Sequence, residues 1–226
     1  MRMAEHPLII EARYNGPPGS GNGGYSAGRF GTTVATGPAV VTLRLPPPLD
    51  TPLSVTRTAA GVKVYDGPRL IAEAAAAPAV DAVVPPVPYE AALAAGADYR
   101  GLTAHPFPTC FVCGPARAAG DGLRLFPGPL PDGRTAAAWT VPEDVSPPVV
   151  WAALDCPGGW AVIAPARPYV LGRIIASVRS LPQPGDRCVV MGQPVAVQGR
   201  KAQVLSTLYG PDGAVLAAAA ATWIAI

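Results

Sequence analysis

Alternating hydrophobic and polar positions recur in two regions of the chain and predict β-strands in both. The alternating runs are 41–45, 53–57 and 62–65 in the first region, and 188–191, 195–197 and 202–208 in the second. A period of two places every other side chain on the same face, which favours strands joined in antiparallel hairpins. Each region then turns into an alanine-rich strand, at 70–77 and at 214–221.

The two regions repeat one another in order. The turn Tyr65-Asp-Gly67 precedes the first alanine-rich strand, and the turn Tyr209-Gly-Pro-Asp-Gly213 precedes the second. Upstream, a strand that ends in a proline-rich corner occurs in both regions, with corners at 46–48 and 182–184. We therefore predict one strand-rich unit of about 100 residues present twice. The expected boundaries are 1–88 and 106–226, joined by a linker at 89–105 that follows three closely spaced prolines.

Each unit also contains one predicted helix ahead of its strand run. In the first unit, a strand at 8–14 and a glycine-rich loop lead to a helical segment at 25–30. In the second, a hairpin of 123–126 with 134–140 precedes Ser146 and Pro147, a typical N-cap and first helical position. The helix that follows, 149–155, is apolar nearly all round except at Asp155, so we expect it to be buried against the sheet.

Composition narrows the function classes. Only 14% of the 226 residues are charged, against about 25% in an average soluble domain, and the net charge is +2 with no Lys/Arg cluster. This charge pattern excludes a nucleic-acid-binding protein and provides no basic surface for binding anionic lipid. The longest apolar stretch, 214–226, is shorter than the roughly 20 residues of a membrane-spanning helix. No signal peptide is visible at Met1–Pro7. We expect a cytoplasmic protein without a membrane partner, and a homo-oligomer would explain the thin polar surface.

Three short motifs in the second unit point to a family. They are Cys110-Phe-Val-Cys113-Gly114, Asp121-Gly-Leu-Arg-Leu-Phe126, and Asp155 with Gly159-Trp160. Together with a buried helix and a curled sheet occurring twice, the chain resembles a double hotdog protein, similar to the small hotdog acyl-CoA thioesterases of the phenylacetate-pathway type. The resemblance implies an α+β fold of two tandem hotdog folds, each a curled antiparallel sheet wrapped on a central helix.

The resemblance also implies where a site would lie. Those thioesterases usually carry His-Gly-Gly at the start of the helix, with an Asp seven residues after the second Gly. Here Asn22-Gly23-Gly24 takes the first place, but Gly31 stands where the Asp would be. The second unit has Asp155, but Ser146-Pro147-Pro148 replaces His-Gly-Gly. If each family site combines the Gly-Gly end of one helix with the Asp of its neighbour, the chain keeps one composite site.

The chemistry implied for this site is hydrolysis of an acyl-CoA or acyl-carrier thioester. The free N–H groups of Gly24 and Tyr25 would hold the carbonyl oxygen, and Gly23 would allow close approach. Asp155 would act as general base or as nucleophile, and Asn22 would orient the thioester or a water molecule. Tyr25 and Trp151 are the candidate substrate-binding side chains. We expect no metal and no cofactor.

Each of these residues could instead have a purely structural role. The segment Asn22-Gly23-Gly24 could be a flexible loop, Asp155 a paired structural carboxylate, and Trp151 and Trp160 core residues. A non-catalytic acyl-thioester binding or scaffold protein is the alternative function. The missing histidine and the prolines at 147 and 148 favour that alternative.

The four cysteines are too sparse for a disulfide framework, so we interpret them as reduced. Cys110 and Cys113 form a single Cys-x-x-Cys pair, and with His105 and Cys156 they would make a zinc site of the Cys3His type. Because structural zinc motifs usually have a second close pair, we expect packing in a turn rather than a metal or redox site. His6 and His105 lie in proline-flanked segments and receive no catalytic role, which argues against the hydratase branch of double hotdog proteins.

Overall fold

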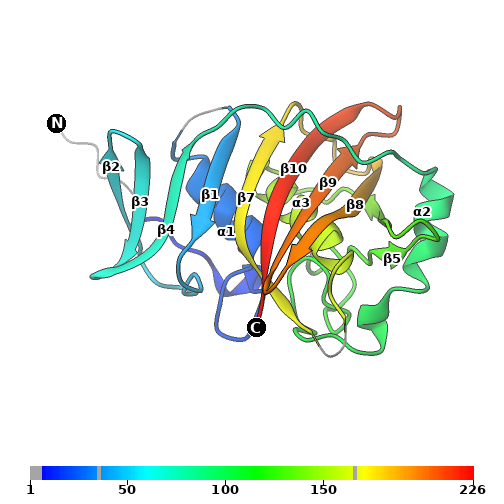
Figure 1. Cartoon of the computed structure of the whole chain (residues 1–226), viewed down its shortest axis with the longest axis horizontal. Coiled ribbons are helices and arrows are strands. Elements are labelled where there is room, and N and C mark those ends of the chain that lie inside the picture. The colour runs from blue at the N-terminus through cyan, green and yellow to red at the C-terminus, as the bar shows by residue number, and fades with distance from the viewer. Residues whose placement is uncertain (1–6, 35–36, 165–166) are drawn as a thin grey trace.

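The chain folds into one ten-stranded antiparallel sheet that curls around two central helices (Figure 1). The computed structural model describes residues 7–34, 37–164 and 167–226, so His6 and the start of the chain lie outside the described residues. The strands are β1 (Ala39–Leu43), β2 (Ser54–Thr58), β3 (Gly61–Asp66), β4 (Arg69–Ala76), β5 (Gly128–Pro129), β6 (Thr135–Thr140), β7 (Tyr169–Val178), β8 (Arg187–Gln198), β9 (Lys201–Tyr209) and β10 (Val215–Ala225). The α-helices are α1 (Gly23–Gly31), α2 (Tyr89–Gly96) and α3 (Pro147–Trp160). None of the described helices is long and apolar enough to cross a membrane.

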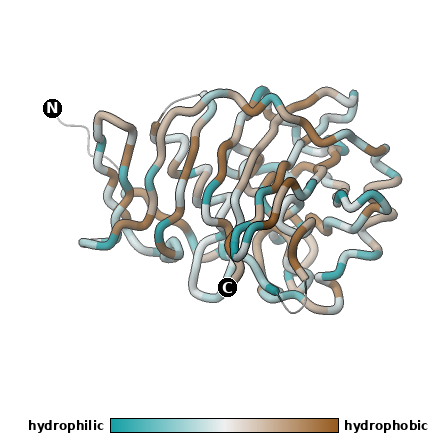
Figure 2. Tube along the Cα trace, viewed as in Figure 1, coloured by the Kyte–Doolittle hydropathy of each residue, from teal (hydrophilic) through white to brown (hydrophobic). Residues whose placement is uncertain are grey.

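The predicted duplication is visible in the strand order. The sheet runs β2-β3-β4-β1-β7-β10-β9-β8-β6-β5, so the order 2-3-4-1 is mirrored by 7-10-9-8. The two halves join where β1 pairs with β7, from Ala39 opposite Ala176 to Thr42 opposite Arg173. The expected α+β architecture of two tandem hotdog folds is therefore confirmed. Hydrophobic residues run along the strands of both halves, and hydrophilic residues gather at the hairpin turns (Figure 2).

The two central helices touch through glycines of α1. A Cβ atom added to Gly24 would lie 2.5 Å from Asp155 Cβ, and one added to Gly28 would lie 2.7 Å from Pro148 Cα. Since no larger residue fits between the helices at these points, the glycine content of α1 follows from close packing. The prediction that the helix around Asp155 is buried is confirmed, because every residue of α3 from Val149 to Trp160 is buried.

Two predicted strands are wrong. Segment 8–14 forms only an isolated bridge between Leu8 and Leu53, followed by a 3₁₀ turn, Ala12–Tyr14. The turn forms because Asp50 accepts the Ala12 N–H at 2.8 Å and the chain must bend toward the glycine-rich loop. Segment 123–126 does not pair with β6 either. Its amides bond to the cysteine loop instead, with Leu123 N–H donating to Phe111 O and Leu125 N–H to Val112 O.

The segment between β4 and β5, which connects the two halves, is hydrogen-bonded to the sheet. Val80 N–H donates to Ser177 Oγ at 2.7 Å, Val84 N–H donates to Thr207 Oγ1 at 2.9 Å, and Tyr209 Oη donates to Val84 O at 2.7 Å. The segment expected as a linker, 89–105, contains α2 and a 3₁₀ turn, Arg100–Leu102. A small apolar cluster of its own, which includes Val84, Ala92 and Met191, packs under this connection. Since neighbouring side chains of a strand point to opposite faces, the second half is covered on both faces of its sheet.

Candidate functional site

The start of α1 and the middle of α3 meet at Asp155. The Gly24 N–H donates to Asp155 Oδ2 at 2.9 Å, and Asn22 Nδ2 lies 3.5 Å from the same oxygen. Asn22 is also the N-cap of α1, where its Oδ1 accepts the Tyr25 N–H at 2.9 Å. The structure thus brings together the four residues that the sequence assigned to the composite site, Asn22, Gly23, Gly24 and Asp155.

The backbone donors are arranged differently from the expectation. Gly24 and Tyr25 were expected to hold free N–H groups, but these two groups bond to Asp155 and Asn22. The reason is local: a polar N-cap and a neighbouring carboxylate both satisfy orphan donors of the first helical turn. Among the hydrogen bonds of the described residues, none involves the Gly23 N–H, and Gly23 lines the adjoining cavity.

Asp155 is held in an apolar environment. Its side chain is 2% exposed, and burial raises the pKa of this carboxyl to about 7, although the Gly24 N–H and Asn22 partly oppose the shift. Oδ2 receives the hydrogen bonds, whereas Oδ1 is buried without a partner among the described residues. An unpartnered buried oxygen is costly, and such atoms occur where a ligand or a reacting water is bound.

A cavity of about 420 Å³ opens beside these residues, and both halves line it. The first half contributes the glycine-rich loop from Gly16 to Gly23 and the corner from Leu43 to Pro47. The second contributes Asp155, Trp160, the start of β7 and the end of β10. Its lining is mostly apolar with a few polar groups, which is typical of a pocket for a small organic ligand.

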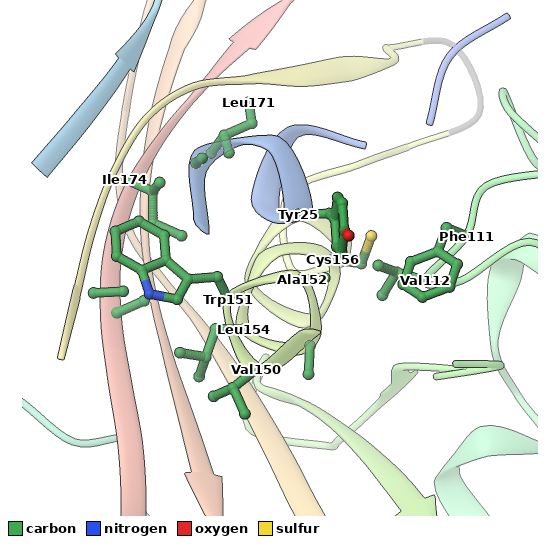
Figure 3. Packing of buried hydrophobic residues seen from close by; sticks show 14 of the residues in the cluster. Tyr25, Phe111, Val112, Val150, Trp151, Ala152, Leu154, Cys156, Leu171 and Ile174 are labelled. Atoms are coloured by element: carbon green, nitrogen blue, oxygen red, sulfur yellow. The ribbon is translucent and has the colours of Figure 1, made fainter. Parts of the chain in front are cut away.

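Neither expected substrate-binding side chain lines this cavity. Tyr25 stacks on Tyr14 with ring centroids 3.7 Å apart, and Trp151 packs over Gly28 and Gly31. Figure 3 shows Trp151 on the side of α3 that faces Ile174, and Tyr25 on the side toward Phe111. Both are buried, Tyr25 at 5% and Trp151 at 4% exposure, so the structure places them in the core.

The cavity wall includes residues that the sequence did not assign to the site. His105 and Trp160 line it, as does Trp223, whose indole Nε1 is buried without a partner among the described residues. Trp223 follows an alanine-rich strand segment, and nothing in that pattern singles it out. Trp160 stands five residues after Asp155 in the same buried helix, and this spacing is the feature of the sequence that could have assigned it to the site.

A cluster of three cysteines borders the same cavity. The Sγ atoms of Cys110, Cys113 and Cys156 all lie within 4.8 Å of one another, and the Cys113 and Cys156 sulfurs are 3.3 Å apart. All three are free and buried. Hydrogen bonds from the Cys113 and Cys156 thiols and from backbone N–H groups hold the pKa of Cys110 below its usual value. The sequence analysis weighed these three cysteines, together with His105, as a zinc site of the Cys3His type and favoured packing in a turn.

The equivalent contact of the other pair, where the start of α3 meets the end of α1, is called the mirror position. Among the described residues it contains no site comparable to that at Asp155. Pro148 packs against Gly28, and the Trp151 ring fills the space above Gly31, 3.2 Å from where a Cβ would stand. Ser146 caps α3 without a side-chain hydrogen bond.

Comparison with known proteins agrees on the architecture. No family model and no curated protein sequence matches the chain. Among solved structures, a protein of unknown function with the hot dog fold from Alicyclobacillus acidocaldarius aligns over 96% of this chain and 91% of its own, with a TM-score of 0.60 and 12% identity. A candidate thioesterase from Novosphingobium aromaticivorans aligns over 97% and 99%, with a TM-score of 0.60 and 14% identity. The tesB protein of Mycobacterium avium aligns over 93% and 89%, with a TM-score of 0.57 and 10% identity. Similarity at this level of identity establishes the hotdog fold along the chain.

Proposed function

We propose that this double hotdog protein hydrolyses an acyl thioester, of CoA or of an acyl carrier, at one composite site between its halves. The observation that carries the proposal is the position of Asp155 in the cavity wall beside the N-terminus of α1, with its Oδ1 buried and without a partner among the described residues. The neighbouring cavity is apolar enough for an acyl group and polar at the end where Asn22 and Asp155 stand.

In the proposed reaction, the N-terminus of α1 binds the thioester carbonyl. The Gly23 N–H is the donor that borders the cavity, and the helix dipole adds to its effect on the developing oxyanion. As general base, Asp155 takes a proton from a water molecule whose oxygen attacks the carbonyl carbon, and the C–S bond then breaks while the leaving thiolate takes up that proton. As nucleophile, Asp155 instead forms a mixed anhydride as the C–S bond breaks, and water then hydrolyses the anhydride. A pKa near neutrality suits a base, because a large fraction is ionised while the proton affinity stays high.

Asn22 has a positioning role in this proposal. Its amide fixes the first turn of α1 through Tyr25 N–H and reaches Asp155 Oδ2 at 3.5 Å. An amide cannot exchange a proton as a histidine can, so among the four residues of the composite site Asp155 is the one that can move a proton.

The test is a hydrolysis assay on a panel of acyl-CoA esters of varied chain length, with Asp155→Asn compared with wild type. Removal of a general base should lower kcat/KM by about 100-fold or more. Asp98→Asn is the matched control, because Asp98 is an exposed carboxylate away from the cavity lining. Equal turnover by Asp155→Asn and wild type would contradict the assigned role.

The same panel separates hydrolysis from the alternative of non-catalytic binding. The engagement of Gly24 N–H by Asp155 is the observation that favours binding alone, since that donor is occupied. Thermal stabilisation by an acyl-CoA without release of free thiol would support a binding protein, and measurable thiol release would reject it.

A further inference from the structure

Three thiols from separate parts of the chain converge on the cavity wall. Cys110 and Cys113 come from a loop without helix or strand, and Cys156 comes from α3. Their Sγ atoms lie within 4.8 Å of one another. Zinc bound tetrahedrally by thiolates at about 2.3 Å holds its sulfurs roughly 3.8 Å apart. The observed cluster therefore already has the dimensions of a three-thiolate metal site.

Two of the three sulfurs accept hydrogen bonds from side-chain N–H groups. Trp160 Nε1 donates to Cys113 Sγ at 3.4 Å, and Asn22 Nδ2 donates to Cys110 Sγ at 3.7 Å. Outer hydrogen bonds of this kind orient metal ligands and stabilise the anionic form of the sulfur. Buried thiolates without a cation would be costly, so this environment suits a bound ion.

His105 takes part as a donor rather than as a ligand. Its Nδ1 accepts the Phe107 N–H at 2.8 Å, which places the ring proton on Nε2. Nε2 lies 3.3 Å from Cys113 Sγ, so this N–H points at a sulfur. The protein ligands are then three cysteines, all of which line the cavity.

We propose that Cys110, Cys113 and Cys156 bind one zinc ion in the wall of the cavity. Soft thiolate ligands select zinc over the hard cations Mg²⁺ and Ca²⁺. Three protein ligands with one open position match the ligand count of zinc sites that bind water or substrate. The ion would tie the cysteine loop to α3 next to Asp155. This proposal stands independently of thioester hydrolysis.

The first experiment measures metal in the protein purified without chelators. We expect about one zinc per chain, and substitution by Co²⁺ should give the near-ultraviolet charge-transfer absorption of cobalt thiolates. Cys113→Ser should lose the zinc and the absorption. Cys188→Ser is the matched control, since Cys188 is buried but lies outside the cluster. A reduced wild-type protein that takes up neither zinc nor cobalt would overturn the proposal, as would equal metal loss in Cys188→Ser.

A second variant tests the ligand set without removing a thiol. In His105→Ala, the site should keep its stoichiometry and lose about 10- to 100-fold in zinc affinity, as expected for an outer-shell partner. The cobalt absorption should persist in that variant. Complete loss of metal from His105→Ala would contradict the three-cysteine assignment.

Discussion

The two halves share one strand order, yet their central helices, α1 and α3, differ both at the N-terminus and at the position where an acidic residue would stand. Helix α1 begins with Asn22-Gly23-Gly24 and has Gly31 where an acid would complete a second site. Helix α3 begins with Pro147-Pro148 and carries Asp155. Proline has no N–H to donate to an oxyanion, and the Trp151 ring occupies the space above Gly31. Each half therefore supplies one component of the proposed site, and at the equivalent positions of the other pair the helices are packed together by Pro148 and Trp151.

The halves also differ in how their sheets are covered. Strands β1–β4 are 5 to 8 residues long, whereas β7–β10 are 9 to 12 residues long. In the second half of the sheet, α3 packs on one face, and the segment that connects the two halves and contains α2 packs on the other. The half that supplies Asp155 is therefore packed on both faces of its strands, as the catalytic role proposed for this residue would require.

The largest expected effect concerns the mirror position. Trp151→Ala empties the space above Gly28 and Gly31, so the free energy of unfolding should fall by about 3–5 kcal/mol in denaturant titrations. Trp151→Phe should recover part of this loss. If Trp151 were a substrate contact instead of a core residue, stability would change little and KM would rise.

The next effect concerns the contact at Asp155. In Gly24→Ala, the new Cβ meets Asp155 Cβ, and the Trp151 carbonyl oxygen lies 2.8 Å away. We expect a loss of about 2–3 kcal/mol in unfolding free energy, because backbone cannot yield as a side chain does. Gly31→Ala is the matched comparison, since its Cβ meets the Trp151 ring at 3.2 Å and Ala39 Cβ at 3.6 Å but no backbone atom within those contacts, and it should cost about 1 kcal/mol. Equal losses in the two variants would contradict the asymmetry.

A smaller effect should follow removal of the N-cap of α1. Asn22→Ala loses the bond to Tyr25 N–H, which should cost about 1 kcal/mol of unfolding free energy. Asn22→Ser keeps a capping oxygen and should be nearly as stable as wild type. Calorimetric melting of the three proteins measures both effects, and an Asn22→Ser protein as unstable as Asn22→Ala would argue against capping.

The smallest effect is expected at the start of α3. Pro148→Ala restores an N–H there but adds no carboxylate near Gly31, so kcat per chain should stay unchanged. Unfolding free energy should change by less than about 0.5 kcal/mol. A doubling of kcat would show that the mirror position is a suppressed second site.

The sequence predicted the duplication because period-two alternation and the two alanine-rich strands are local patterns. It also predicted that Asn22, Gly24 and Asp155 would meet, through a motif divided between the halves. Their roles in chemistry stay predictions. The failures were tertiary: segment 8–14 had strand composition but formed a single β-bridge, between Leu8 and Leu53, and segment 123–126 hydrogen-bonded to the cysteine loop. The occupation of Gly24 N–H by Asp155 depends on helix contact, which no local pattern records.

The two edge strands of the ten-stranded sheet, β5 and β2, determine whether the sheet can pair with a strand of another chain. At one end stands β5, only two residues long, whose Pro129 has no N–H to offer a further strand. At the other stands β2, short and mostly exposed, with polar side chains that include Arg57 and Thr58. Short, polar or proline-containing edges resist pairing with a strand of another chain. The sheet is thus protected against edge-to-edge aggregation at both ends, although only 14% of the residues of the chain are charged.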